Sequence, residues 1–149
     1  MLYIRKFFPW LLVLTIALRF LHFGPDIDAP HVWRQSDTGH FIRDYYENGI
    51  DLLHPAVCWM GGHGTLILEF PLVEAVVSLA YHITGEDHRT ARVVFLLFFL
   101  ISAIYLRKIM ALFTSNGIPE LATLIYCVSP LAIFFSRAIH IDFSVVALT

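Results

Sequence analysis

Long apolar runs separated by polar segments dominate this chain. Three runs have the length and composition of membrane-spanning helices and a fourth begins near the last residue, at about 7–23, 90–106, 119–136 and from 143 onward. A helix over the first run reaches ~25 Å, slightly less than the ~30 Å hydrocarbon core of a bilayer. We expect Arg19, near the end of this run, to extend its side chain to the interface. We also expect Pro130 to kink the third run.

A polar segment at 24–89 separates the first two runs, and an amphipathic helical pattern covers about 37–48. Ser36 or Asp37 can act as its N-cap, because a short oxygen-bearing side chain accepts the free N–H groups of a first turn. Gly49 stands where a left-handed residue ends a helix. One side of the pattern is apolar and another is charged, so we predict a helix that lies at the membrane interface, with Asp37 at its start.

The same segment ends with a second short helical pattern at 71–84. Glu74 interrupts it and leaves ten consecutive uncharged residues. Apolar stretches of ~10–14 residues are more often interfacial or re-entrant than spanning. We therefore predict a second interfacial helix here.

The orientation of the chain depends on whether 71–84 crosses the bilayer. If it lies flat, the cytoplasmic side receives four basic residues, Arg5, Lys6, Arg107 and Lys108; if it crosses, a different set lies there, and charge counting alone does not choose. Segment length favours the flat arrangement, which makes 24–89 an external loop. The first run also resembles a signal peptide, but no small-x-small cleavage site precedes Pro25, so we favour an uncleaved anchor.

Composition agrees with a membrane protein and excludes several other classes. Hydrophobic residues make up 58% of the chain and the mean hydropathy is +0.70, whereas soluble chains have about 45–50% apolar residues. A net charge of −2 and the absence of a basic run give no surface for nucleic acid. Cys58 and Cys127 form no disulfide framework, so we expect free thiols. The predicted fold class is all-α, as a polytopic membrane protein.

Three polar motifs resemble the N-terminal part of a known enzyme family. They are Trp33-Arg34-Gln35-Ser36-Asp37-Thr38, Glu69-Phe70-Pro71, and Ser136-Arg137-Ala138 with Asp142 downstream. Together they are similar to glycosyltransferase family 39, polytopic enzymes of the GT-C fold that include protein O-mannosyltransferases and lipid A aminoarabinose transferases. Many relatives carry Asp-Glu where this chain has Asp37-Thr38. The resemblance covers nearly all of the 149 residues.

The resemblance implies a multi-pass enzyme of the cell membrane, a bacterial plasma membrane being favoured over the endoplasmic reticulum. It would move a sugar from a polyprenyl-phosphate donor to a lipid, glycan or protein acceptor on the external face, among membrane lipids. By the same resemblance, Asp37 and Asp142 are the catalytic acids of the first two external loops. Glu69 matches a carboxylate associated with metal binding in some members.

General chemistry supports these roles and leaves alternatives open. Glycosyl transfer needs a base to take the acceptor proton, and a carboxylate in a dry cleft can have its pKa raised toward that task. Arg34 or Arg137 can supply the guanidinium fork that suits a departing phosphate. However, Arg137 can equally snorkel, and Arg34 can pair with a nearby acid such as Asp26 or Asp28.

A divalent metal is the one cofactor that the sequence suggests. His63 and Glu69 are the candidate ligands, but no His-x-x-x-His or Cys-His spacing occurs, and scattered interfacial histidines explain the sequence more simply. Glu69 can also bind substrate, or merely favour the start of the helix that follows it.

Two other classes of function compete with the enzyme. A transporter or flippase would carry acids within its spans, whereas here most acids lie in loops. A non-catalytic membrane assembly subunit would need no converging carboxylates. Because the run beginning at Phe143 is too short to cross a bilayer, we expect this stretch to be the front end of a larger protein and to be inactive alone.

Overall fold

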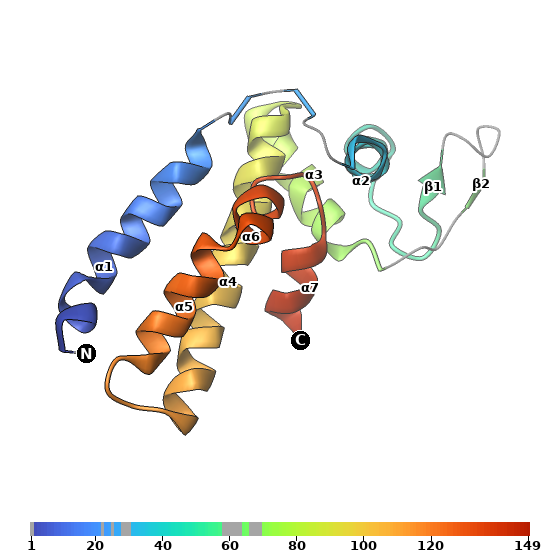
Figure 1. Cartoon of the computed structure of the whole chain (residues 1–149). Helices are drawn as coiled ribbons and strands as arrows, with labels where there is room; N and C mark the ends of the chain where they lie inside the picture. Colours follow the sequence, from blue (N-terminus) through green and yellow to red (C-terminus); the bar gives the residue numbers. More distant parts are fainter. Residues whose placement is uncertain (1, 22, 25, 28–30, 58–63, 66–69) are drawn as a thin grey trace. The chain divides into compact units, whose positions relative to one another are not determined.

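The computed structural model describes residues 2–21, 23–24, 26–27, 31–57, 64–65 and 70–149 (Figure 1). These residues are mostly helical, which confirms the all-α class; the strands in the described ranges are two-residue segments. The chain divides into two compact units. The first comprises 1–23, 95–137 and 142–149, and the second comprises 24–94 and 138–141.

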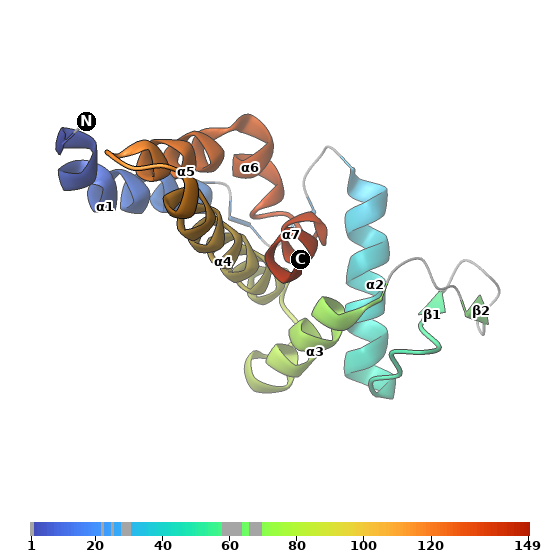
Figure 2. The same cartoon turned by 90° about the horizontal axis from the view of Figure 1, so that it is seen from below.

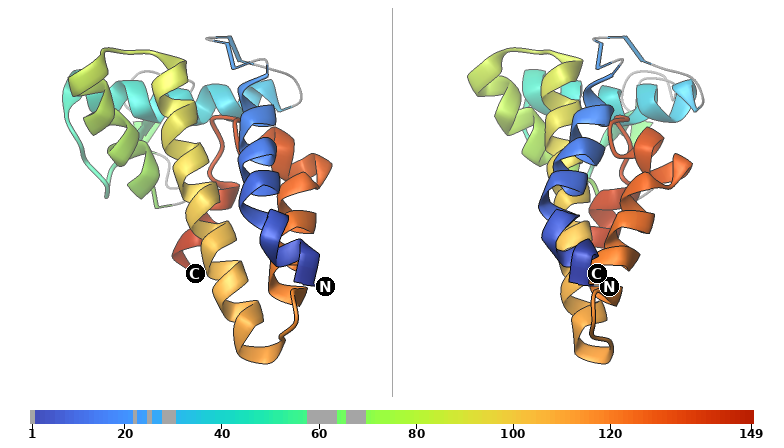
Figure 3. Two further views of the ribbon diagram at one scale, coloured as in Figure 1. Left: turned by 90° about the vertical axis from the view of Figure 1, so that its left-hand side faces the viewer. Right: turned by 60° about the vertical axis from the view of Figure 1, so that its left-hand side comes forward.

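The first unit is built mainly from three helices that lie along one another (Figures 1 and 3). Helix α1 (Leu2–Ala17) continues into the 3-10 turn η1 (Leu18–Phe20) and packs beside α5 (Ile118–Val128). Helix α4 (His88–Phe113) contributes its residues from 95 onward, and the turn after it reverses the chain into α5 (Figure 3). Short helices α6 (Pro130–Phe135) and α7 (Asp142–Leu148) complete the unit. Its core contains Leu96, Phe99, Ala103, Cys127 and Ala132.

Helix α4 confirms the predicted helix at 90–106. Within the described ranges it alone has both the length and the apolar composition needed to cross a bilayer. Helix α1 begins earlier than the first predicted run and includes Arg5 and Lys6. The spans other than α4 stay predictions.

The single kinked helix predicted over 119–136 is instead two helices, and the break falls at Pro130, where the kink was expected. Helix α5 ends at Val128, Ser129 is extended with ψ 139°, and Pro130 starts α6. Proline has no N–H to continue the hydrogen-bond ladder, and its ring pushes the preceding residue out of helical conformation. The Ser129 hydroxyl then caps α6 by accepting a hydrogen bond from the Ala132 N–H at 3.2 Å.

The expectation that Arg19 reaches the interface is also wrong. Its side chain is fully buried, and its guanidinium donates to the Ser136 Oγ at 2.7 Å, the Thr15 carbonyl at 2.5 Å and the Cys127 carbonyl at 2.7 Å. It also lies 4.3 Å from the centroid of the Phe99 ring. The break at Pro130 leaves carbonyls at the end of α5 without helical donors, and a cation is favourable at a helix C-terminus. Arg19 is therefore an internal cap that joins η1 to α5 and α6.

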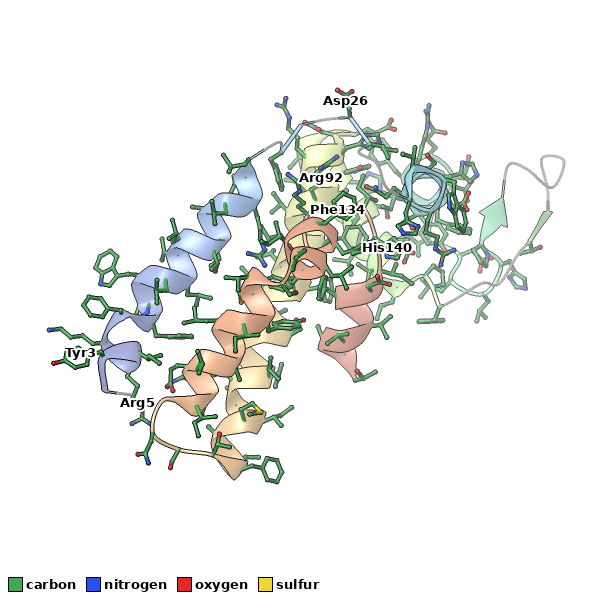
Figure 4. The ribbon with its side chains drawn as sticks, viewed as in Figure 1. Tyr3, Arg5, Asp26, Arg92, Phe134 and His140 are labelled. Atoms are coloured by element: carbon green, nitrogen blue, oxygen red, sulfur yellow. The ribbon has the colours of Figure 1, made fainter. Side chains whose placement is uncertain are left out.

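The second unit is organised around two helices, α2 (Val32–Asn48) and α3 (Leu72–Thr84), which pack against each other (Figure 2). Their buried faces meet through residues spaced at helical intervals, among them Phe41, Ile42 and Tyr45 on α2 and Val73, Val77 and Tyr81 on α3. A short hairpin, β1 (Ala56–Val57) with β2 (Gly64–Thr65), pairs antiparallel. The Arg92 guanidinium donates to the carbonyl of Asp26, and Figure 4 labels both residues.

The two helical patterns of this unit were predicted with unequal success. Helix α3 matches 71–84 closely, between Pro71 and Gly85. Helix α2 ends before Gly49, whose φ of 96° favours glycine, as predicted. The prediction that Ser36 or Asp37 caps this helix is wrong. The helix begins at Val32, and His31 occupies the N-cap position with φ 62°.

Candidate functional site

Asp37 lies in the second turn of α2, in the middle of the polar motif. Its side chain is half-buried. It makes no hydrogen bond or ion pair with any residue in the described part of the chain, and it does not cap the helix. Its neighbours along the helix, Gln35 and Thr38, are buried with exposed fractions of 1% and 3%. Asp37 is therefore a carboxylate on a packed helix that makes no bond to the part of the chain that the structure describes.

Two residues next to Asp37 on α2, Gln35 and Thr38, make hydrogen bonds through their side chains. The Gln35 Oε1 accepts from the N–H of Ile139 at 3.3 Å, and the Thr38 hydroxyl donates to the carbonyl of Arg34 at 3.1 Å. The first bond links the motif on α2 to the segment 138–141, which is more than one hundred residues away in sequence. Sequence reasoning did not assign this role to Gln35. The one feature of the sequence that pointed to a buried Gln35 is its place on the same helix face as Thr38 and Phe41.

Glu74 and Arg34 form a second polar feature of the same unit. Glu74 lies in the first turn of α3 and is only 3% exposed. Its burial raises the pKa of the carboxyl above its ordinary value, while its own backbone N–H and the positive charge of Arg34 on α2 oppose the rise. Sequence analysis treated Glu74 only as an interruption of an apolar stretch. Asp37 and Glu74 are thus two carboxyls of this unit in different environments, the first half-exposed and the second buried.

The remaining predicted site residues lie elsewhere or outside the described residues. Asp142 opens α7, and the Arg137 guanidinium donates to the carbonyl of Leu21; both belong to the first unit. Arg137 thus holds the chain that follows η1. The sharing of one site by Asp37 and Asp142 stays a prediction. Glu69 and His63 lie outside the described residues, and within those residues no group of three potential metal ligands occurs.

No family model, no curated protein and no solved structure matches this chain.

The chemistry available at the site follows from its own residues. A carboxylate such as Asp37, with no bond to the residues described, can accept a proton from a hydroxyl or amine nucleophile. A guanidinium such as Arg34 can bind a phosphate with paired N–H donors. A buried carboxyl such as Glu74 can stay protonated at higher pH than an ordinary glutamate and so donate a hydrogen bond. These three residue types supply a proton acceptor, an anion-binding guanidinium and a hydrogen-bond donor, which are the groups that a transfer reaction with an anionic leaving group needs.

Proposed function

We propose that this chain is part of a membrane glycosyltransferase that takes a sugar from a polyprenyl-phosphate donor. The acceptor is a lipid, glycan or protein nucleophile at the external face of a bacterial plasma membrane. The proposal includes the polytopic GT-C-like arrangement, in which α4 is one span and the segment 24–89 is the first external loop.

The proposal rests on the surroundings of the Asp37 carboxylate. The alternative role for Asp37 was a helix N-cap. The helix α2 begins five residues before Asp37, so Asp37 is not its cap. A half-buried carboxylate without a bond to the described residues, on a helix whose Gln35 and Thr38 are buried, is available to accept a proton. The motif around it is also the one that resembles the family 39 enzymes.

The proposed reaction is a single displacement at the anomeric carbon. Asp37 accepts the proton of the acceptor hydroxyl or amine as its oxygen or nitrogen forms a bond to that carbon. The bond between the anomeric carbon and the phosphate oxygen breaks, and the polyprenyl phosphate departs with the electron pair. In the proposal, Arg34 or Arg137 binds the departing phosphate, because paired N–H donors stabilise charge that develops on its oxygens. Asp142 is the second carboxylate.

Substitution of Asp37 tests this function, with a matched control on the same helix. Asp37→Asn keeps the size of the side chain and removes the base, so turnover should fall by ~10²-fold or more. Asp44→Asn makes the same chemical change at a carboxylate that accepts a 2.8 Å hydrogen bond from Asn48, and turnover should stay near the wild-type value.

The measurement is sugar transfer by the intact protein in membranes, supplied with extracted polyprenyl-phosphate sugars, at matched expression. If Asp37→Asn keeps more than half of the wild-type turnover, Asp37 is not the base. A loss of the same size in both variants would show a general effect of charge on α2 rather than catalysis by Asp37.

A further inference from the structure

An apolar cavity opens between three helices of the first unit. Its volume is about 300 Å³, and its walls come from α1, α4 and α5. Leu12 and Ile16 line it from α1, and Leu100, Ala103 and Ile104 line it from α4. Arg107 and Lys108 lie at one end of the α4 wall, one turn beyond Ile104. The cavity is therefore apolar along its length and basic at one end.

A second, more polar cavity adjoins that basic end. It measures about 600 Å³ and shares Phe8 and Arg107 with the first. Arg5, Thr114, Ser115 and Glu120 contribute its polar groups. Figure 4 shows Arg5 at the N-terminal end of α1, near the turn that joins α4 to α5. The two cavities together form one amphipathic site.

The charges of this site are unbalanced in favour of cations. Glu120 is the one carboxylate in its lining, and it accepts a hydrogen bond from Arg107 at 2.8 Å while Arg5 lies 3.8 Å away. Lys108 is exposed and has no carboxylate partner among the described residues; its ammonium lies 5.3 Å from the Tyr105 ring. Three cations and one anion leave two positive charges for a ligand.

We propose that this amphipathic site binds an anionic phospholipid. One acyl chain lies in the apolar cavity, and the phosphate headgroup lies where the two cavities meet, between Arg5 of the polar cavity, Lys108 of the apolar cavity and Arg107, which lines both. Basic pockets between helices on the cytoplasmic side of a membrane recognise anionic headgroups in this way. The topology predicted from the sequence puts this end of α1 and α4 in the cytoplasm, so the lipid comes from the leaflet opposite to the proposed transfer reaction. The lipid site rests on the membrane topology included in the proposed function, but not on the transfer reaction or on Asp37.

Lipid titration followed by native mass spectrometry of the detergent-solubilised protein tests the site. The probes are phosphatidylglycerol, phosphatidylcholine and undecaprenyl phosphate, each added separately. The wild-type protein should bind phosphatidylglycerol more tightly than the other two. Arg5→Gln and Lys108→Gln should each reduce the preference for phosphatidylglycerol over phosphatidylcholine by about fivefold. Lys6→Gln removes the same charge outside both cavities and should leave the preference within twofold.

A second pair of variants tests the apolar part. Ile104→Trp places a large side chain at an exposed position that lines the cavity, and it should reduce phosphatidylglycerol binding; Ile101→Trp, exposed on α4 but outside the lining, should not. Since Ile104 and Ile101 are both exposed, neither change disturbs the core. Equal affinity for the two phospholipids, tighter binding of undecaprenyl phosphate, or an equal effect of each variant and its control would overturn the proposal.

Discussion

Replacing Arg19 with lysine tests whether this residue is an internal helix cap or a side chain that snorkels to the membrane interface. Lysine keeps the buried positive charge, so the desolvation cost stays, but a compact ammonium does not reproduce the planar fork that reaches three acceptors. The two long-range acceptors are the Ser136 hydroxyl and the Cys127 carbonyl, each at 2.7 Å. A hydrogen bond to a charged group contributes about 1.5–3 kcal/mol, so loss of one should destabilise the fold by about 1.5–3 kcal/mol and loss of both by about 3–6 kcal/mol.

The measurement is the free energy of unfolding in mixed detergent micelles, followed by circular dichroism as the denaturing detergent increases. Arg43→Lys is the matched control, because Arg43 is exposed on α2 and pairs with Glu47 on the surface. A snorkelling arginine would tolerate lysine, since both side chains place their charge at the interface on an apolar stem. If Arg19→Lys is no less stable than Arg43→Lys, the buried network does not stabilise the protein.

Two further predictions concern the second unit and the orientation of the chain. Folding raises the pKa of Glu74, so the glutamate of the unfolded chain ionises at lower pH than that of the folded chain. The free energy of unfolding should therefore fall as pH rises from about the ordinary pKa of 4.5 to the raised pKa. Glu74→Gln should remove this fall, and a variant with the same pH profile of unfolding as the wild type would contradict the prediction. Single cysteines replacing Asn48, Glu86 or Ser115 in a cysteine-free protein should react with an impermeant maleimide in intact cells at 48 and 86 but not at 115. Protection at 86 would refute an external 24–89 segment.

Local signals in the sequence located the ends of several helices. Pro71 and Gly85 bracket α3, and Gly49 ends α2. Each acts through its own backbone, because proline lacks an N–H and glycine tolerates positive φ. Cys127 was expected to be a free thiol, and the structure confirms this. The helix ends, unlike the state of Cys127, depend on neighbouring residues only and can be predicted without tertiary contacts.

Features that depend on long-range contacts were not predictable from the sequence. Helix α2 begins earlier than its capping residues suggest, because Gln35 and Thr38 are buried against the rest of the second unit and their packing outweighs the local preference for a cap. Arg19 finds acceptors 108 and 117 residues away. The burial of Glu74 similarly depends on which face of α3 meets α2. A single sequence gives the residue types, but their partners follow from packing.

The central claim is that the protein consumes a polyprenyl-phosphate sugar with Asp37 as the base. The most direct measurement is mass analysis of the polyprenyl-phosphate sugars in membranes of cells that lack the gene. One such species should accumulate, return to the normal amount when the wild-type gene is restored, and remain high when the restored gene carries Asp37→Asn at equal expression. Unchanged amounts of every polyprenyl-phosphate sugar after deletion would contradict the claim.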